Sequence, residues 1–336
     1  MIHSSKRILG IVAPFILALV VIVVMVGLAG WSQSLTVVYR AQPLELLEAL
    51  LLFVIATLLL GFGLYEALRA SGTKARVRQT MYAHIAGLLL SDVTPARSGY
   101  VGSAAILKQS SGIPSSQTLA AIFCVQSVSF AFKAAVTIVA IPYFLLRVRL
   151  TMPLVYSLAI AAVISLLATV LFLILVWSKR GVSWLDRSLA RADSLPLIGK
   201  VTRPIRLLLR EIQAKGSRVG RRGLAYVAAC SISSSLFFAL ALYPIGLALG
   251  ILNVSVYDWI ILGPLVATLG FVPITPAGLG VQEATYVIIL SLMGVPLSSA
   301  VPFSLVARFL YVVPDLAGFP ILLKSGTEYV GKWLNL

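Results

Sequence analysis

Long apolar stretches constrain the fold of this chain more than any other feature of its sequence. Six of them reach the roughly 20 residues that a helix needs to cross the hydrocarbon core of a bilayer. They cover residues 8–30, 44–69, 115–142, 152–177, 224–250 and 297–323. Only 11% of the 336 residues are charged, whereas soluble domains carry about 25%. We therefore expect one all-α, polytopic integral membrane domain over residues 1–336.

Two further apolar regions, 79–110 and 259–294, do not fit simple crossings. Each is interrupted in its middle, by Thr94-Pro95-Ala96-Arg97-Ser98-Gly99 in the first region and by Thr275-Pro276-Ala277-Gly278-Leu279-Gly280 in the second. The flanking pieces of about 12–16 residues would form only about 18–24 Å of helix, which is too short to span. Each region is either one kinked crossing helix or a re-entrant hairpin that returns to its own side.

The distribution of positive charge favours the re-entrant interpretation. The loop 179–222 holds twelve Lys or Arg residues against three acidic residues, so we expect it to be cytoplasmic. A hairpin at 79–110 leaves this loop cytoplasmic, whereas a single crossing would place it outside. A hairpin at 259–294 then enters from outside, and both termini are cytoplasmic. The sequence predicts six transmembrane helices plus two re-entrant hairpins in the cell membrane, with an amphipathic surface helix near 203–210.

The two interrupted regions resemble each other. Thr94-Pro95-Ala96-x-x-Gly99 matches Thr275-Pro276-Ala277-x-x-Gly280 at an offset of 181, and Gly112-Ile113-Pro114 matches Gly294-Val295-Pro296 at an offset of 182. At the second offset Gln126 falls opposite Arg308, and Lys133 opposite Asp315. Because the hairpins enter from opposite sides, we expect an inverted-topology repeat of residues 44–142 and 224–323. Many secondary transporters have this architecture, with the substrate site where the breaks meet.

Each break combines residues that suit an anion site. Thr before Pro is the usual order at the start of a helix, and a helix N-terminus offers free N–H groups and a positive dipole end. Alternatively, these residues only form a tight turn, for which glycine is also suited. The predicted substrate-binding residues are Arg97, Arg308, Thr94, Gly99, Thr275, Gly278 and Gly280.

Charged residues near the breaks also indicate function. Each charge at mid-membrane costs roughly 2.5–3.5 kcal/mol on insertion scales, so such residues are rarely only structural. Glu283 can reach Arg308 across a cavity, although a purely structural ion-pair network remains an alternative. The predicted charge-coupling residues are Asp92, Glu283 and Asp315. Lys133 has no assigned role.

Several functional classes lack the residues they need. Two histidines and two cysteines, with no metal-binding spacing among them, predict no metal site, no cofactor and no catalytic residue. The net charge of +16 comes mostly from residues between apolar spans, which suits contact with lipid headgroups and not with nucleic acid. The spacing Gly246-x3-Gly250 permits close helix contact within one chain or between two copies in a homodimer.

The motif Pro276-x-Gly278-Leu279-Gly280-x-x-Glu283, followed by Gly294-Val295, Ala300, Arg308 and Asp315, resembles a known family. This is the flippase-like membrane family typified by the transmembrane region of bacterial lysylphosphatidylglycerol synthetase/flippase, and the resemblance covers most of the chain. At the first break the family's Gly-Glu is Gly99-Tyr100 here, and its Glu-Arg and Asp on the following span are replaced by Val125, Gln126 and Lys133. The aminoacyl-transferase domain of the larger members is missing, so the resemblance implies no lipid aminoacylation.

These observations lead to a hypothesis and two alternatives. The leading hypothesis is a lipid translocase that moves a phosphate-bearing headgroup through a polar cavity between the two hairpins. Its partners would be membrane lipids with anionic or zwitterionic headgroups. One alternative is a non-transporting scaffold or partner of a lipid- or glycan-modifying enzyme. The other is an intramembrane transferase acting on a polyprenyl-phosphate lipid, for which the isolated Asp92 and Glu283 are a poor match.

Overall fold

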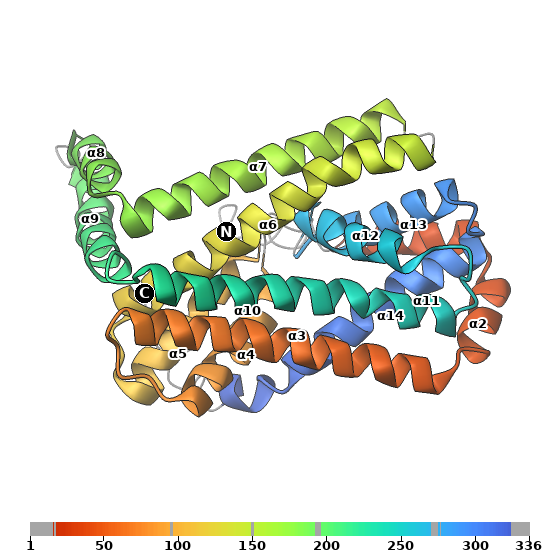
Figure 1. Ribbon diagram of the computed structural model, residues 1–336, viewed down its shortest axis with the longest axis horizontal. Coiled ribbons are helices and arrows are strands. Elements are labelled where there is room, and N and C mark those ends of the chain that lie inside the picture. Colours follow the sequence, from red (N-terminus) through yellow and green to blue (C-terminus); the bar gives the residue numbers. More distant parts are fainter. Residues whose placement is uncertain are drawn as a thin grey trace, which may run out of the picture.

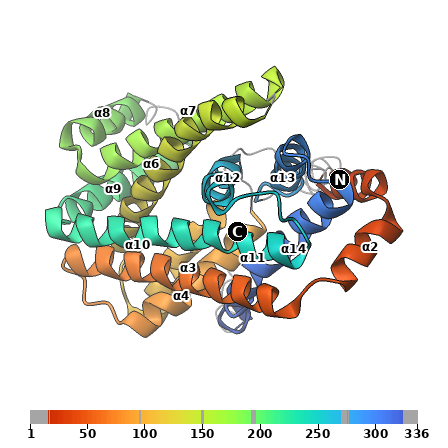
Figure 2. The same ribbon diagram turned by 45° about the vertical axis from the view of Figure 1, so that its right-hand side comes forward.

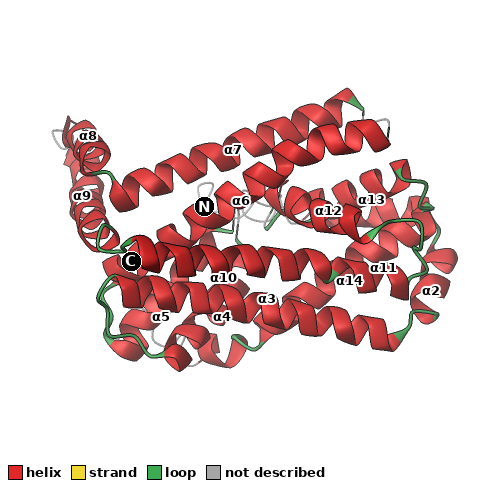
Figure 3. Ribbon diagram, in the orientation of Figure 1, coloured by secondary structure: helices red, strands yellow, loops and turns green. Residues whose placement is uncertain are grey.

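The computed structural model describes residues 16, 18–94, 97–148, 151–191, 196–269, 275 and 277–323, without the side chains of 196–201. This part of the chain contains helices and connecting loops but no strands (Figure 3). The helices in chain order are Ala18–Ala29, α2 (Trp31–Tyr39), α3 (Pro43–Ala70), α4 (Val77–Asp92), the 3₁₀ helix η1 (Ser98–Val101), α5 (Gly102–Ser111), α6 (Ser115–Arg147), α7 (Met152–Trp177), α8 (Lys179–Ala190), α9 (Pro196–Gly216), α10 (Arg221–Leu240), α11 (Leu242–Ala248), α12 (Val256–Leu269), α13 (Val281–Leu292) and α14 (Leu297–Leu316).

Five helical segments of the described chain are long and apolar enough to cross a membrane. They are α3, α6, α7, α10 continued by α11, and α14, and they match the spans predicted at 44–69, 115–142, 152–177, 224–250 and 297–323. A sixth is the pair Ala18–Ala29 and α2, which is bent by 87° at Gly30. Gly30 has a φ of 81°, which an L side chain rarely adopts. Residues 8–15 and 17 of the predicted first span lie outside the described residues.

The long helices run along the longest axis of the molecule (Figures 1 and 2). α3 lies beside α10, and α6 lies beside α7. At one end α8 and α9 cross the direction of these helices, and at the other end lies α2. α4 and α5 lie toward the α8–α9 end, whereas α12 and α13 lie toward the α2 end (Figure 1). The molecule therefore has a pair of short helices toward each end.

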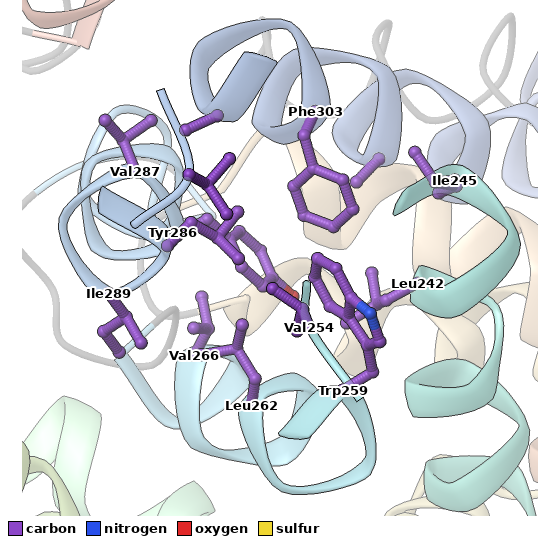
Figure 4. Packing of buried hydrophobic residues seen from close by; sticks show 14 of the residues in the cluster. Leu242, Ile245, Val254, Trp259, Leu262, Val266, Tyr286, Val287, Ile289 and Phe303 are labelled. Carbon is purple, nitrogen blue, oxygen red and sulfur yellow. The ribbon is translucent and has the colours of Figure 1, made fainter. Parts of the chain in front are cut away.

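The apolar interior forms two clusters, each drawn mainly from one half of the chain. The first surrounds Trp259, whose ring centroid lies 4.6 Å from that of Phe303 (Figure 4). A Cβ on Gly246 would come within 2.8 Å of the Trp259 indole, so this glycine allows a close contact inside the chain. The second cluster contains Leu64 and Leu107 with residues of α6. Residues of both clusters, Phe53 from the first and Tyr100 from the second, line one shared cavity.

Each pair of short helices flanks a backbone break. α4 and α5 have 16 and 10 residues, and α12 and α13 have 14 and 12, so each is shorter than a spanning helix. The two breaks touch, because the Ala277 N–H donates a hydrogen bond to the Thr94 carbonyl at 3.1 Å. Residues 95, 96, 270–274 and 276 lie outside the description.

The prediction that helices start directly after Thr94 and Thr275 is wrong. η1 begins at Ser98, after Arg97 with a φ of 55°, and α13 begins at Val281. Left-handed residues before α13 (Ala277, Gly278 and Gly280) delay its start, because a positive φ is incompatible with a right-handed helix. At the first break the Thr94 hydroxyl accepts from the Gly99 N–H at 2.7 Å, five residues along the chain.

The loop predicted at 179–222 folds into α8 and α9, which are joined by one carboxylate. Asp186 of α8 accepts hydrogen bonds from Arg206 Nε at 2.7 Å and from Arg210 Nη2 at 2.6 Å, both on α9. These two guanidinium groups hold the pKa of the Asp186 carboxyl at about 2, below its ordinary value of 3.8. The ion pairs therefore keep α8 and α9 together above pH 4, and they weaken as pH falls from 3.8 to 2.

Asp186→Asn should loosen the α8–α9 unit, because a neutral amide cannot neutralise two arginines. We expect faster trypsin cleavage within 187–215 at neutral pH, followed by mass spectrometry of the fragments. In the unmodified protein, pepsin cleavage of the same segment should rise as pH falls from 3.8 towards 2. Glu211→Gln, a change at an exposed position of α9, is the matched control. Equal cleavage of all three proteins would contradict the role of Asp186.

Gly99→Ala should destabilise the first break. A Cβ at this position would lie 2.3 Å from the Leu90 carbonyl oxygen and 2.7 Å from the Thr94 hydroxyl, so the backbone must move. Overpacking of this kind costs about 1–3 kcal/mol, which thermal unfolding in detergent would report as a lower midpoint. Gly220→Ala is the control, because a Cβ there meets nothing within 4 Å. The same midpoint for both variants would contradict the close approach at Gly99.

Candidate functional site

Arg97 stands at the first break and links it to α14. Its Nη2 lies 3.3 Å from Asp92 Oδ1, at the end of α4, and donates to the Tyr311 hydroxyl at 2.8 Å. Tyr311 is 214 positions away in the sequence. The side chain of Arg97 is only 21% exposed, so its charge is largely enclosed by the protein. The first break is therefore tied to α14 through a guanidinium group.

Arg308 on α14 makes the matching link to the second break. Its Nε donates to the Glu283 carboxylate and its Nη1 to the Tyr311 hydroxyl. Nη1 also lies 3.4 Å from the Ala277 carbonyl oxygen. The other oxygen of Glu283 accepts from the Gly280 N–H at 2.7 Å, so this carboxylate stabilises the start of α13 as well as the arginine. The contact between Glu283 and Arg308 that the sequence suggested is present.

Tyr311, which was not among the predicted residues, joins the two arginines. Its hydroxyl accepts from both guanidinium groups, and its ring centroid lies 5.4 Å from the Arg97 Cζ and 5.2 Å from the Arg308 Cζ. Favourable cation–π contact is expected at such distances. The spacing of three residues after Arg308 places Tyr311 on the same helix face, and this was the only sequence signal for it.

Asp315 lies on the same face of α14 as Arg308 and Tyr311. It is 4% exposed, and its side chain lies beside that of Asp92 on α4. One carboxylate oxygen of each residue, Asp92 Oδ2 and Asp315 Oδ1, makes no hydrogen bond to the described residues. The five predicted charged residues thus come together around Tyr311: Asp92, Arg97, Glu283, Arg308 and Asp315.

Two adjoining cavities open onto this cluster. The larger one, of about 120 Å³, is lined by residues of α3, α4, α6, α10, α12 and α14, among them Arg97, Lys133 and Asp315. The smaller one, of about 20 Å³, is lined by Glu283 and Arg308. Both cavities share Arg97 and Tyr311 in their walls. Arg97 and Tyr311 therefore lie at the boundary between them, and Arg308 lines the smaller cavity.

A third, mostly apolar groove reaches the second break from outside the cluster. It has a volume of about 580 Å³ and runs between the helix Ala18–Ala29, α7 and α13. Leu154 and Ile160 line its apolar walls, and Thr275 and Gly280 also line it. The groove thus places apolar side chains next to one of the breaks.

The N–H groups of the three predicted glycines are occupied within the protein. The Gly99 N–H is bonded to the Thr94 hydroxyl, the Gly280 N–H to Glu283, and the Gly278 N–H to the Thr275 carbonyl at 3.2 Å. The N–H groups of these three glycines are thus used inside the protein, because an unpaired N–H costs several kcal/mol in hydrocarbon. These three N–H groups are therefore not available to an anion in this structure. Among the described residues, no group of three His, Cys, Asp or Glu residues is arranged to hold a metal ion.

Comparison with known proteins assigns the chain to a family. A sequence model described as the lysylphosphatidylglycerol synthase TM region matches residues 12–318, which is most of the chain. The comparison with curated proteins found no match. The matched region includes both breaks, the charged cluster and all six candidate membrane spans. The chain is therefore a multi-pass membrane protein that belongs to the family of the lysylphosphatidylglycerol synthase transmembrane region.

Proposed function

We propose that this protein is a lipid translocase, which moves a phosphate-bearing headgroup between leaflets while the acyl or prenyl chains stay in the bilayer. One observation carries the proposal. Buried charges of both signs surround a cavity where two helix breaks are joined by the Ala277–Thr94 hydrogen bond. Membership in a family named for a lipid synthase supports a lipid-related function. The lipid would move without any change in its covalent bonds.

Burying charge inside a membrane is costly. Each ionised group at mid-membrane costs roughly 2.5–3.5 kcal/mol on insertion scales, and five such groups gather here. A core that only held helices together would be at least as stable with apolar residues of similar volume. A polar headgroup, in contrast, needs charged partners to enter the hydrocarbon region. The cluster is thus better explained by a passing headgroup than by stability.

The residues divide into two roles in this proposal. Arg97 and Arg308 neutralise the headgroup during its passage. Asp92, Glu283 and Asp315 neutralise the arginines when the site is empty, or carry protons. The apolar groove beside Thr275 and Gly280 suits a lipid chain that follows the headgroup from the membrane. The lipid partners would have anionic or zwitterionic headgroups.

The same proposal includes the topology. We infer that α4–α5 and α12–α13 are re-entrant hairpins of an inverted repeat in the cell membrane. Their short helices, their repeated Thr-Pro-Ala motif and their location toward opposite ends of the molecule support this topology (Figure 1). The basic α8–α9 unit would then lie on the cytoplasmic surface, together with both termini.

Arg308→Ala and Glu283→Gln should each reduce lipid transfer at least tenfold. The first removes a cation that neutralises the headgroup, and the second leaves Arg308 without its carboxylate. Purified protein is reconstituted into vesicles with a fluorescent phospholipid, and transfer is followed by quenching of the outer leaflet. Arg69→Ala is the matched control, because Arg69 is 64% exposed and pairs only with nearby Glu66 among the described residues.

Unchanged transfer in both cluster variants would rule out these roles. A scaffold function predicts a different result, in which the variants lose stability or a co-purifying partner while the vesicles show no protein-dependent transfer. Thermal unfolding of each variant is therefore measured beside transfer, so that a loss of folding is recognised.

Tyr311→Phe should speed transfer and lower the unfolding midpoint. The hydroxyl accepts a hydrogen bond from Arg97 and from Arg308, so its loss removes one internal acceptor from each guanidinium group and makes each more available to the headgroup. Hydrogen bonds to charged groups contribute about 1.5–3 kcal/mol to stability, while the remaining ring keeps its packing against Phe238 at 5.7 Å. The vesicle assay and thermal unfolding measure both effects. Slower transfer in a folded variant would contradict the idea that the hydroxyl competes with the headgroup for the two arginines.

A further inference from the structure

Asp315 is the acid of the charged cluster that has no arginine of its own. Arg97 pairs with Asp92 and Arg308 pairs with Glu283, so neither arginine forms an ion pair with Asp315. The residue is only 4% exposed, and its Oδ1 accepts no hydrogen bond from the described residues. A buried carboxylate anion without a partner is costly, whereas a protonated carboxyl group is much less so.

Asp92 supplies the contact that Asp315 does have. The two side chains lie within hydrogen-bonding reach of each other. The side chain of Asp92 is 10% exposed; its Oδ1 lies 3.3 Å from Arg97, and its Oδ2 accepts no hydrogen bond from the described residues. Ionised carboxylates only accept hydrogen bonds, so the two groups can bond to each other only when one of them carries a hydrogen. Buried polar atoms are normally paired, and the partner missing here is therefore a proton.

Backbone packing holds the two acids together. Asp92 is the last residue of α4, and Gly318 follows directly after α14, three residues beyond Asp315. A Cβ on Gly318 would come within 2.6 Å of the Ala86 Cα in α4, so no side chain separates the two segments here. Two negative charges fixed this close together in a low dielectric repel each other strongly. A shared proton removes this repulsion and leaves one negative charge for Arg97 to neutralise.

The nearby hydroxyl of Tyr100 cannot take the place of this proton. Tyr100 lines the same cavity as Asp315, but its hydroxyl lies 2.7 Å from His84 Nδ1, and His84 Nε2 lies 3.0 Å from the Thr57 carbonyl oxygen. A carbonyl oxygen only accepts, so the hydrogen of neutral His84 is on Nε2 and its Nδ1 is an acceptor. Tyr100 therefore donates its hydrogen to His84 and offers none to the two acids.

The other groups around the two acids do not suit a metal cation. Arg97 at the first break, Lys133 on α6, and Arg308 and Tyr311 on α14 act electrostatically on the acids or line the same cavity. Three of these four groups are cations, which repel a metal ion. Hard metal ions also take about six or more oxygen ligands, and no group of three His, Cys, Asp or Glu in the described chain could hold one. A proton needs only two oxygens.

We propose that Asp92 and Asp315 form one proton-binding site, in which the two carboxyl groups share a proton whose binding is coupled to passage of the headgroup. A proton taken up from water forms one O–H bond and lowers the charge of the two acids from two negatives to one. Arg97 then has a weaker internal competitor and is more available to an anionic headgroup. Proton binding and headgroup binding therefore favour each other, equally in both directions. The coupling rests on the proposed function, whereas the shared proton is a property of the protein alone.

Infrared spectroscopy of the full-length protein in detergent detects the proton directly. At neutral pH we expect the band of a protonated carboxyl group, and we expect Asp315→Asn and Asp92→Asn each to lose it. Glu48→Gln, at an exposed position of α3, is the matched control and should keep the band. Absence of the band from the unmodified protein, or its persistence in both folded Asn variants, would overturn the site.

The same proton should make stability depend on pH. Unfolded aspartates lose their protons above about pH 4, so the folded protein binds one proton more and its unfolding midpoint should fall as pH rises. Asp315→Asn should remove this component of the fall, because an amide N–H supplies the same hydrogen bond at every pH. Replacing choline chloride with sodium chloride should leave the midpoint unchanged. A saturable rise with sodium, or an equal fall in Asp315→Asn and Glu48→Gln, would overturn the proton site.

Coupling is measured in the vesicle assay with an anionic fluorescent phospholipid. We expect transfer to slow at least threefold as pH rises from about 6 to about 8, and Asp315→Asn to transfer at the same rate at both values. An equal pH dependence in the two proteins would overturn the coupling. A carboxyl band that depends on Asp315 in a protein that transfers no lipid would support the site and contradict the proposed function. Transfer that depends on Arg308, without such a band, would overturn the site and leave the proposed function in place.

Discussion

Backbone hydrogen bonding in a medium without water is the constraint on which this structure depends. A break in a helix frees N–H and carbonyl groups, and inside a membrane only protein or an enclosed cavity can satisfy them. Here the two breaks satisfy each other through Ala277 and Thr94, and each uses a side chain of its own segment, Thr94 for Gly99 and Glu283 for Gly280. The charged cluster is built on this framework, because Glu283 also binds Arg308.

The sequence was sufficient for features that depend on length and composition. The spans of α3, α6 and α7, the positions of both breaks and the identity of the buried charges follow from apolar runs and from Thr, Pro and Gly. Of the features that depend on three-dimensional contact, the sequence predicted the pair Glu283–Arg308 but not the following ones. The start of α13 is set by left-handed residues, and Tyr311 meets Arg97 across 214 positions. The bend at Gly30 depends on one backbone angle, which the pattern of apolar residues in the sequence does not predict.

The two halves share the positions of their breaks in the sequence but differ in the charged residues beside them. At the second break Glu283, Arg308 and Gly280 form a closed set of hydrogen bonds beside a cavity of only about 20 Å³. The first break borders the cavity of about 120 Å³, where Lys133 stands at the position that corresponds to Asp315. The first half thus carries an ammonium group where the second half carries a carboxylate, and both side chains line the larger cavity. The smaller cavity is lined by Glu283 and Arg308, so the two sides of Tyr311 offer different environments to the same ligand.

The difference between the two cavities affects how tightly each side could hold a charged headgroup. A site that bound phosphate strongly on one side only would hold it there, because release would cost the full binding energy. Here every arginine of the cluster already has an acceptor inside the protein, Asp92 or Glu283 together with Tyr311. A phosphate would therefore exchange one set of charge-assisted hydrogen bonds for another, and the net free-energy change at each step would be the small difference between two large terms. In the proposed translocase, internal carboxylates that compete with the ligand would keep binding weak enough for passage, which would give the buried acids a function that a simple anion-binding site does not need.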